Sequence, residues 1–173
     1  MFYNFRKNKK AFTLVELIVV IAIIGVLAAI LVPAMLGYVR KSKITTANTT
    51  AKSIYNAMNS TLVEMDTADK TPPASSTADN NGAEWTGSLT GTSDEVYFKN
   101  AVYTYFSDII KVKKFAYTIE NGACTATGVL NGSYPGAYPK VWDVTMFKSA
   151  NNTVANAEAA MNNAYFGTSS SST

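Results

Sequence analysis

The stretch KKAFTLVELIVVIAIIGVLAAILVP, from Lys9 to Pro33, decides how the rest of the sequence is interpreted. From Leu17 to Gly37 the chain has 21 residues without a charge, which is long enough to cross a bilayer as a helix. One carboxylate, that of Glu16, stands at the front edge of this run. Because a charge is costly in hydrocarbon, a passive membrane anchor gives no reason for a glutamate at this position.

Two common kinds of N-terminal segment, a secretory signal peptide and a signal anchor, each explain only part of this stretch. A secretory signal peptide has a basic region before its apolar core, but here the apolar run exceeds the usual length of about 7–15 residues and no small-residue cleavage site follows it. A signal anchor accounts for the length and not for Glu16. Basic residues flank both ends of the run, and four before it against three after it favour an N-terminus on the cytoplasmic side. These residues are Arg6, Lys7, Lys9 and Lys10 before the run and Arg40, Lys41 and Lys43 after it.

Composition excludes several classes of function. The 173 residues leave room for one membrane helix and one domain of about a hundred residues. The net charge of +3 comes from the leading basic residues, because the chain from Phe12 onward has 11 basic and 12 acidic residues. That balance gives no global attraction for nucleic acid. The chain has no histidine and no phosphate-binding or GxSxG motif, so we expect no enzyme, no cofactor and no metal site. The single Cys124 rules out an intramolecular disulfide and is expected to be a small buried apolar residue.

The order of residues around Ala11 resembles that of a type IV prepilin. Lys9-Lys10-Ala11 precedes Phe12-Thr13-Leu14-Val15-Glu16-Leu17, and an apolar run with Gly25 and Pro33 follows. In that family a peptidase cuts on the cytoplasmic side, directly before the phenylalanine, and then N-methylates the new terminus. The resemblance therefore implies scission between Ala11 and Phe12. Two features depart from the family: Ala11 stands where Gly is usual, and the 11-residue leader is longer than in most pilins that begin with phenylalanine.

The resemblance also gives a role to Glu16. In the family this carboxylate is thought to pair with the N-terminal amine of a neighbouring subunit, here that of Phe12, as helices bundle into a filament. A paired charge is tolerated where a lone one is not, and the pair fixes axial register. The alternative is an interfacial carboxylate without a partner. Gly25 and Pro33 also have two interpretations: ordinary membrane-helix packing, with Gly25 and Ala29 as a close-approach pair, or local unwinding between Gly25 and Pro33 inside a filament.

The remaining pattern predicts an α+β fold in which a long N-terminal helix packs on a small antiparallel sheet with an additional helix. We expect three regions: a cleaved leader at 1–11, a hydrophobic helix at 12–39, and a soluble head at 40–173 that includes the second half of the long helix. The helix runs from Phe12 to about Asp66, with Pro72-Pro73 beyond its end. Its apolar residues recur at three- and four-residue spacing: Leu36, Val39, Ile44, Ala47, Ala51, Ile54, Met58, Leu62 and Met65.

The head is expected to contain several shorter elements. A polar surface loop covers 67–91, and its run Asp79-Asn80-Asn81-Gly82 lacks the calcium-loop pattern. Thr92-Ser93-Asp94-Glu95 reads as a capping box for a second helix that continues to Ile110. A β-hairpin follows, formed by Phe115–Glu120, an Asn121-Gly122 turn and Cys124–Leu130. The remaining expectations are a turn region from Pro135 to Pro139, a strand at Val141–Phe147, a short helix at Val154–Ala164 capped by Thr153, and a disordered tail at Ser169–Thr173.

By resemblance, the function is that of a structural subunit of a type IV pilus, best matched by a major pilin, acting in adhesion, twitching motility or aggregation. The implied partners are other copies of the chain in a helical homopolymer, a prepilin peptidase, a pilus assembly platform with its ATPase, and the inner or plasma membrane. The implied location is single-pass in the membrane before assembly and then the extracellular pilus on a bacterial surface. Two alternatives stay open: a pseudopilin of a type II secretion or competence system, and a membrane-anchored extracellular binding module.

Overall fold

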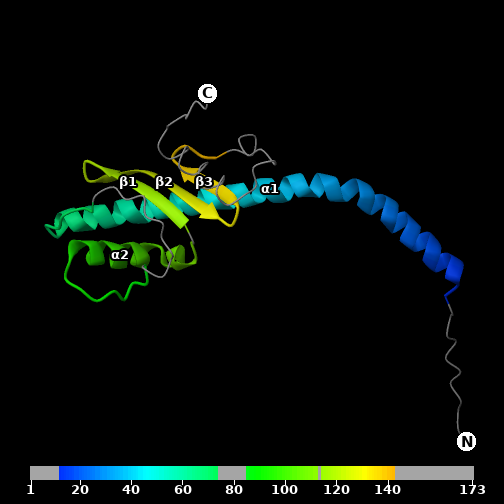
Figure 1. The fold of residues 1–173 in the computed structure, drawn as a ribbon, viewed down its shortest axis with the longest axis horizontal. Coiled ribbons are helices and arrows are strands. Elements are labelled where there is room, and N and C mark those ends of the chain that lie inside the picture. Colours follow the sequence, from blue (N-terminus) through cyan, green and yellow to red (C-terminus); the bar gives the residue numbers. More distant parts are fainter. Residues whose placement is uncertain (1–11, 74–84, 113, 143–173) are drawn as a thin grey trace, which may run out of the picture. The chain divides into compact units, whose positions relative to one another are not determined.

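A computed structural model describes residues 12–73, 85–112 and 114–142. The elements, in chain order, are helix α1 (Leu14–Thr67), helix α2 (Asp94–Tyr105), the 3₁₀ helix η2 (Ser107–Lys111) and strands β1 (Lys114–Glu120), β2 (Ala123–Asn131) and β3 (Tyr134–Tyr138) (Figure 1). Internal contacts divide the chain into two units between Val39 and Arg40. The predicted leader, the Asp79–Gly82 run, the helix after Thr153 and the Ser-rich tail lie outside the described residues.

The predicted long helix is confirmed, since α1 runs from Leu14 to Thr67 against an expected span of Phe12 to about Asp66. In the second unit its apolar stripe is buried at Ile44, Ala47, Ala51, Ile54, Met58, Leu62 and Met65. Spacing of three and four residues puts these side chains on one helix face, which is why they share a core. The stripe does not extend into the first unit, because Leu36 and Val39 are exposed there.

The three strands form an antiparallel sheet in the order β1-β2-β3. The predicted hairpin is confirmed: β1 pairs with β2 from Lys114 opposite Leu130 to Glu120 opposite Ala123. Its turn residues Asn121 and Gly122 both have positive φ, at 52° and 76°. A two-residue turn of this kind matches the right-handed twist of the strands, and Asn-Gly tolerates it best.

The third strand lies earlier than predicted. β3 occupies Tyr134–Tyr138, within the region expected to be a turn, and Leu130 of β2 lies opposite Pro135. Pro135 is tolerated because β3 is at the edge of the sheet, where a missing backbone N–H costs no ladder bond. Val141 and Trp142 are not in a strand, and the rest of the predicted Val141–Phe147 segment lies outside the described residues.

The second helix also differs from its prediction at both ends. Its N-cap is Ser93, whose Oγ accepts from the Val96 N–H at 3.3 Å, so the cap lies one residue later than the predicted Thr92. The helix ends at Tyr105 instead of continuing to Ile110. Phe106 adopts φ −145° and ψ 80°, which is outside the helical region, and the chain resumes as η2.

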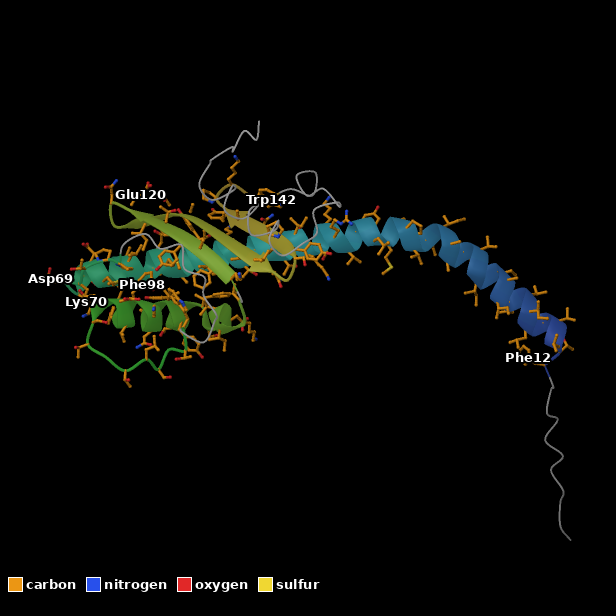
Figure 2. All side chains as sticks on the ribbon, in the orientation of Figure 1. Phe12, Asp69, Lys70, Phe98, Glu120 and Trp142 are labelled. Atoms are coloured by element: carbon orange, nitrogen blue, oxygen red, sulfur yellow. The ribbon has the colours of Figure 1, made fainter. Side chains whose placement is uncertain are left out.

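One hydrophobic core joins α1, α2 and the sheet. Figure 1 shows the sheet and α2 beside the carboxy-terminal part of α1, and residues of all of them share one buried cluster. Phe98 lies between the two helices (Figure 2), and Trp85 makes edge contacts with Phe98, Phe115 and Tyr117 at ring-centroid distances of 5.8, 5.2 and 6.3 Å. Trp85 is 1% exposed, so the predicted surface loop at 67–91 is wrong at this residue.

Polar side chains fix the position of the sheet on α1. Asn48 Oδ1 accepts from the backbone N–H groups of Ala137 and Trp142, and its Nδ2 donates to the Trp142 carbonyl at 2.7 Å. Asn59 makes a similar pair of bonds with the backbone of Cys124, at 3.0 and 3.2 Å. Because the amide groups bind backbone atoms on β2, β3 and the residues after β3, they set the register between helix and sheet in a way that apolar packing alone does not.

The expected burial of Cys124 is confirmed. Its thiol is free, 1% exposed and 4.0 Å from Met58 Sδ. Burial raises the pKa of this thiol to about 12, since the charged thiolate is disfavoured away from water. Tyr117 is also buried and Tyr97 and Tyr103 pack partly against the core, whereas Tyr105 is 52% exposed.

Candidate functional site

The first turn of α1 is closed by a reciprocal pair of side chains, Thr13 and Glu16. The Thr13 hydroxyl donates to Glu16 Oε2 at 2.7 Å, and the Thr13 backbone N–H donates to the same oxygen at 2.9 Å. In return, Thr13 Oγ1 accepts from the Glu16 backbone N–H at 3.3 Å. This is a capping box, in which two backbone donors that the helix leaves unsatisfied find side-chain partners. Thr13 is thus a site residue that the motif search missed, although the T-x-x-E spacing before an apolar run is its sequence signal.

The capping box uses only part of the Glu16 carboxylate. Both bonds from Thr13 end on Oε2, and within the described ranges Oε1 has no hydrogen-bond partner. Phe12 immediately precedes the box and is 84% exposed at the start of the helix (Figure 2). The carboxylate therefore sits four residues from the predicted new terminus with one oxygen open to another molecule.

The rest of the first unit presents apolar side chains and buries none of them. Every described residue from Phe12 to Val39 is exposed, including large ones such as Ile30 at 70%. By length and composition, this part of α1 is suited to cross a membrane. A helix that is hydrophobic all round needs a partner other than water, which lipid or other apolar helices supply.

The other predicted site residues are spread along this segment. Gly25 lies on an open helix surface, with nothing within 4 Å of the position that a Cβ would take. Pro33 is inside α1, and the helix is continuous from Gly25 to Pro33. Ala11 lies outside the described residues. The structure therefore brings Glu16 to Thr13 and next to Phe12, and does not bring Gly25 or Pro33 to either.

The head has an open hollow of about 460 Å³ between α2 and the residues that precede it. Its polar groups are already bonded to each other: Tyr97 donates to Glu64 at 2.6 Å, and Lys70 pairs with Asp94 at 3.2 Å. The side-chain amide of Asn100 accepts from the Leu89 backbone N–H and donates to the Leu89 carbonyl. A ligand would have to displace these bonds. Across the parts of the chain that the structure describes, no group of three or more His, Cys, Asp or Glu side chains is placed to hold a metal.

The N-terminal segment of the chain matches a known sequence family. The family described as "Prokaryotic N-terminal methylation motif" matches residues 6–32. The chain is 41% identical over 63 residues to the type IV major pilin protein PilA of Myxococcus xanthus, a match that covers 36% of this chain and 29% of the relative. It is 39% identical over 74 residues to the type IV major alpha-pilin of Moraxella bovis, covering 43% and 46%. A fimbrial protein of Pseudomonas aeruginosa is 40% identical over 58 residues, covering 34% and 38%.

These relatives confirm the predicted resemblance to type IV pilins that carry the methylation motif. The chain spans less than half the length of each of the three relatives named above. Their names are those of pilins and fimbrial proteins and not of enzymes. No solved structure matches the chain.

Proposed function

We propose that the chain is a structural subunit of a type IV pilus, held in the membrane by residues 12–39 before assembly and then built into a surface filament through the same helix. One observation carries the proposal: an apolar helical segment with no buried side chain begins with a carboxylate inside a methylation motif. The apolar surface suits lipid first and neighbouring helices later, since both are equally apolar.

Processing is the first step of this proposal. The prepilin peptidase cuts between Ala11 and Phe12 and methylates the new amine of Phe12, which keeps its positive charge. In the cleaved chain, the Phe12 amine of one subunit pairs with Glu16 of its neighbour. The capping box supports this pairing, because it holds Glu16 in one conformation through Oε2 and leaves Oε1 for the incoming amine.

Glu16 thus has two separable tasks, and the two are tested by a matched pair of substitutions. Glu16→Gln keeps the cap, since glutamine also serves at this position of a capping box, but removes the charge. Thr13→Val keeps the charge and the side-chain volume but removes the hydroxyl of the cap. We expect Glu16→Gln to lower the amount of sheared filament by roughly tenfold or more, because each incoming amine is buried without its counter-charge. Thr13→Val should lower it less.

The measurement is the ratio of sheared filament to cell-associated protein, with mass spectrometry of both fractions. Wild-type filaments should begin at methylated Phe12, and both variants should still be inserted and cleaved. An uncleaved Met1 terminus in assembled protein contradicts the processing step. Wild-type filament yield in Glu16→Gln contradicts the charge pair, and a loss confined to Thr13→Val would assign the role of Glu16 in assembly to the cap.

Further partners and roles follow from the same proposal. Assembly requires a platform and an ATPase to extract the subunit from the membrane, and the filament then acts in adhesion, twitching motility or aggregation. Gly25 and Pro33 are proposed to allow local unwinding once the helix is packed in the filament, because one lacks a side chain and the other a backbone donor. The amount of sheared filament also distinguishes a pilus subunit from a pseudopilin or an anchored binding module, since only a pilus subunit should be abundant in it.

A further inference from the structure

The charged side chains of the head fall into paired and unpaired groups. Three ion pairs join Lys70 to Asp94, Lys99 to Glu95 and Lys111 to Asp108, at 3.2, 2.8 and 2.7 Å. Glu64 instead accepts hydrogen bonds from the hydroxyl groups of Tyr97 and Tyr105. Lys114 is only partly exposed and has an interaction within the chain. The charges left over after this pairing are the ones available to another molecule.

The unpaired cations of the described residues lie in one half of the head, around β3 and residues 40–52 of α1, which we call the basic end. Within the described residues, the cations without a carboxylate partner are Arg40, Lys41, Lys43, Lys52 and Lys140. Two of them lie over tyrosine rings of β3, with Lys43 Nζ 5.1 Å from the Tyr134 centroid and Lys52 Nζ 5.6 Å from that of Tyr138. The bonds from Asn48 to Ala137 and Trp142 hold the chain around Lys140 to this part of α1.

Within the part of the chain that the structure describes, the unpaired anions of the head gather at the opposite end, which we call the acidic end. It consists of the exposed residues Asp66, Asp69 and Glu120. Glu120 ends β1 next to the hairpin turn, and Asp69 follows α1; Figure 2 shows both at the same end of the head. The bonds between Asn59 and Cys124 hold the hairpin to the last turns of α1. From Lys43 to Asp66 the helix rises roughly 35 Å at 1.5 Å per residue.

Local energetics disfavour the residues of the acidic end. Asp66 lies in the last turn of α1, where the helix dipole is negative and where no basic residue compensates it. Asp69 has φ 53°, a left-handed conformation that glycine or asparagine adopts at lower cost at the end of a helix. The end of α1 therefore gains no stability from the charge of either carboxylate.

We infer that the acidic end of one head binds the basic end of the head of a second copy. The two ends have opposite charge, are unpaired within the chain and lie at opposite ends of the same head. Such a contact is heterologous: one subunit offers its acidic end and receives the next subunit at its basic end, which generates an open filament and not a closed dimer. The inference rests on the proposed function, since it concerns contacts between subunits of the filament.

A second copy explains both ends, whereas an anionic lipid surface explains only one. Phospholipid headgroups would attract Arg40, Lys41 and Lys43, which directly follow the apolar segment. They give no reason for carboxylates at the negative end of a helix dipole. Exposed ion pairs contribute little singly, so we expect the head contact to set subunit order and salt sensitivity while the apolar helices supply most of the binding.

The experiment reverses the charge of each end in the full chain, produced in its native cells. One variant carries Lys43→Glu and Lys140→Glu, a second carries Asp66→Lys and Glu120→Lys, and a third carries all four changes. Asp108→Lys is the control, because it reverses an exposed carboxylate outside the acidic end. We expect each single-end reversal to lower the yield of sheared filament about threefold to tenfold, and the fourfold variant to recover most of it, since it again has opposite ends.

The salt dependence of subunit release is a second test, and the direction of the change is predicted for each variant. Raising ionic strength from about 0.1 M to about 1 M shortens the screening length from about 10 Å to about 3 Å. Isolated wild-type and fourfold-variant filaments should release more subunits at high salt, whereas filaments of each single-end variant should release fewer, because repulsion is screened.

The outcomes separate the inference from the proposed function. If wild-type filaments form and all variants match them in yield and salt response, the inference is wrong while the pilus assignment stands. If only the basic-end reversal lowers the yield and the fourfold variant does not recover, the cations bind another anionic partner such as the membrane and the inference is wrong. If the wild-type chain forms no filament, the proposed function fails and the inference fails with it.

Discussion

The two parts of α1 use the same helical backbone for opposite purposes. Between Leu17 and Val39 its side chains are apolar on all sides apart from the Tyr38 hydroxyl, and all of them are exposed. Between Ile44 and Met65 the apolar side chains keep to one stripe, and that stripe is buried against α2 and the sheet. The partners of the first part therefore lie outside the chain, and those of the second part lie within it.

The difference shows what sets the role of a helix. On the second part, threonine and serine hydroxyls donate hydrogen bonds to the backbone carbonyl four residues earlier in the helix. Thr46 donates in this way to Ser42, and Thr50 to Thr46, each at 3.0 Å. These residues can therefore face water while the helix stays intact. The first part has no threonine or serine after Thr13, and beyond Glu16 it presents almost only apolar side chains. Pattern, and not propensity, distinguishes an exposed apolar helix from a core helix.

Removing the first part of α1 should change the behaviour of the chain most, because it removes the whole exposed apolar segment. A chain that begins at Arg40 keeps the buried stripe, α2 and the sheet, and we propose that it folds independently as the head. It should be a soluble monomer with a mixed helix and strand circular dichroism spectrum and a cooperative unfolding transition. The full chain should partition into membranes. A disordered spectrum of the truncated chain would show that the head needs the apolar segment.

Within the head, Gly136→Ala should have the next largest effect. A Cβ at Gly136 would overlap the backbone of Ala47 and Asn48, so β3 would have to move away from α1. Overpacking of this kind costs about 1–3 kcal/mol, and here the obstacle is rigid helix backbone. Chemical denaturation of the Arg40–Thr173 chain measures the loss.

Gly132→Asn is the matched control for Gly136→Ala. Gly132 has φ 64°, which asparagine tolerates, and nothing lies within 4 Å of its Cβ position. Its unfolding midpoint should stay close to that of the wild type. If Gly136→Ala also leaves the unfolding midpoint unchanged, β3 does not pack directly on the backbone of α1.

Local sequence patterns were sufficient to predict the long helix, the hairpin and the resemblance to the methylation motif. Each depends on neighbouring residues: periodic apolar positions for α1, Asn121-Gly122 for the hairpin turn, and the residues around Ala11 and Glu16 for the methylation motif. Fold class followed from these elements because a striped helix and a hairpin must bury their apolar faces against one another.

Features that depend on distant residues could not be predicted in this way. Trp85 lies in a polar segment and becomes buried only because Phe98 and Phe115 form a site for its ring. β3 contains two residues, Pro135 and Gly136, that disfavour strands, and forms because the edge of the sheet and a close approach to α1 accept them. The roles of Asn48 and Asn59 likewise need partners far along the chain and have no local signal.

A smaller effect should appear in the pH dependence of the head. The pKa of the Cys124 thiol is about 12 in the folded chain against 9.0 as the ordinary value, because burial disfavours the thiolate. The native state therefore keeps a proton that the unfolded state loses between these values, and stability should fall as pH rises through this window. The slope is up to about 1.4 kcal/mol per pH unit.

Cys124→Ala isolates this contribution from other groups that titrate at high pH. Denaturation of the wild-type and Cys124→Ala heads from pH 8 to pH 11 should give curves that converge as pH rises, since only the wild type loses the thiol contribution. Parallel curves would mean that the thiol is open to solvent. In that case thiol reagents should also modify the native head rapidly at pH 8.

The smallest expected change is a gain, and it tests how closely the second part of α1 matches its core. Thr61 and Thr127 are both fully buried, but the Thr127 hydroxyl donates to the Ala51 carbonyl at 2.8 Å while Thr61 Oγ1 has no partner among the described residues. An unpaired buried hydroxyl costs about 1–3 kcal/mol, and valine has nearly the same shape. Thr61→Val should therefore stabilise the head by about 1 kcal/mol, whereas Thr127→Val should destabilise it by a similar amount. Equal losses in both variants, measured by chemical denaturation, would show that Thr61 is hydrogen-bonded after all, for example to a buried water.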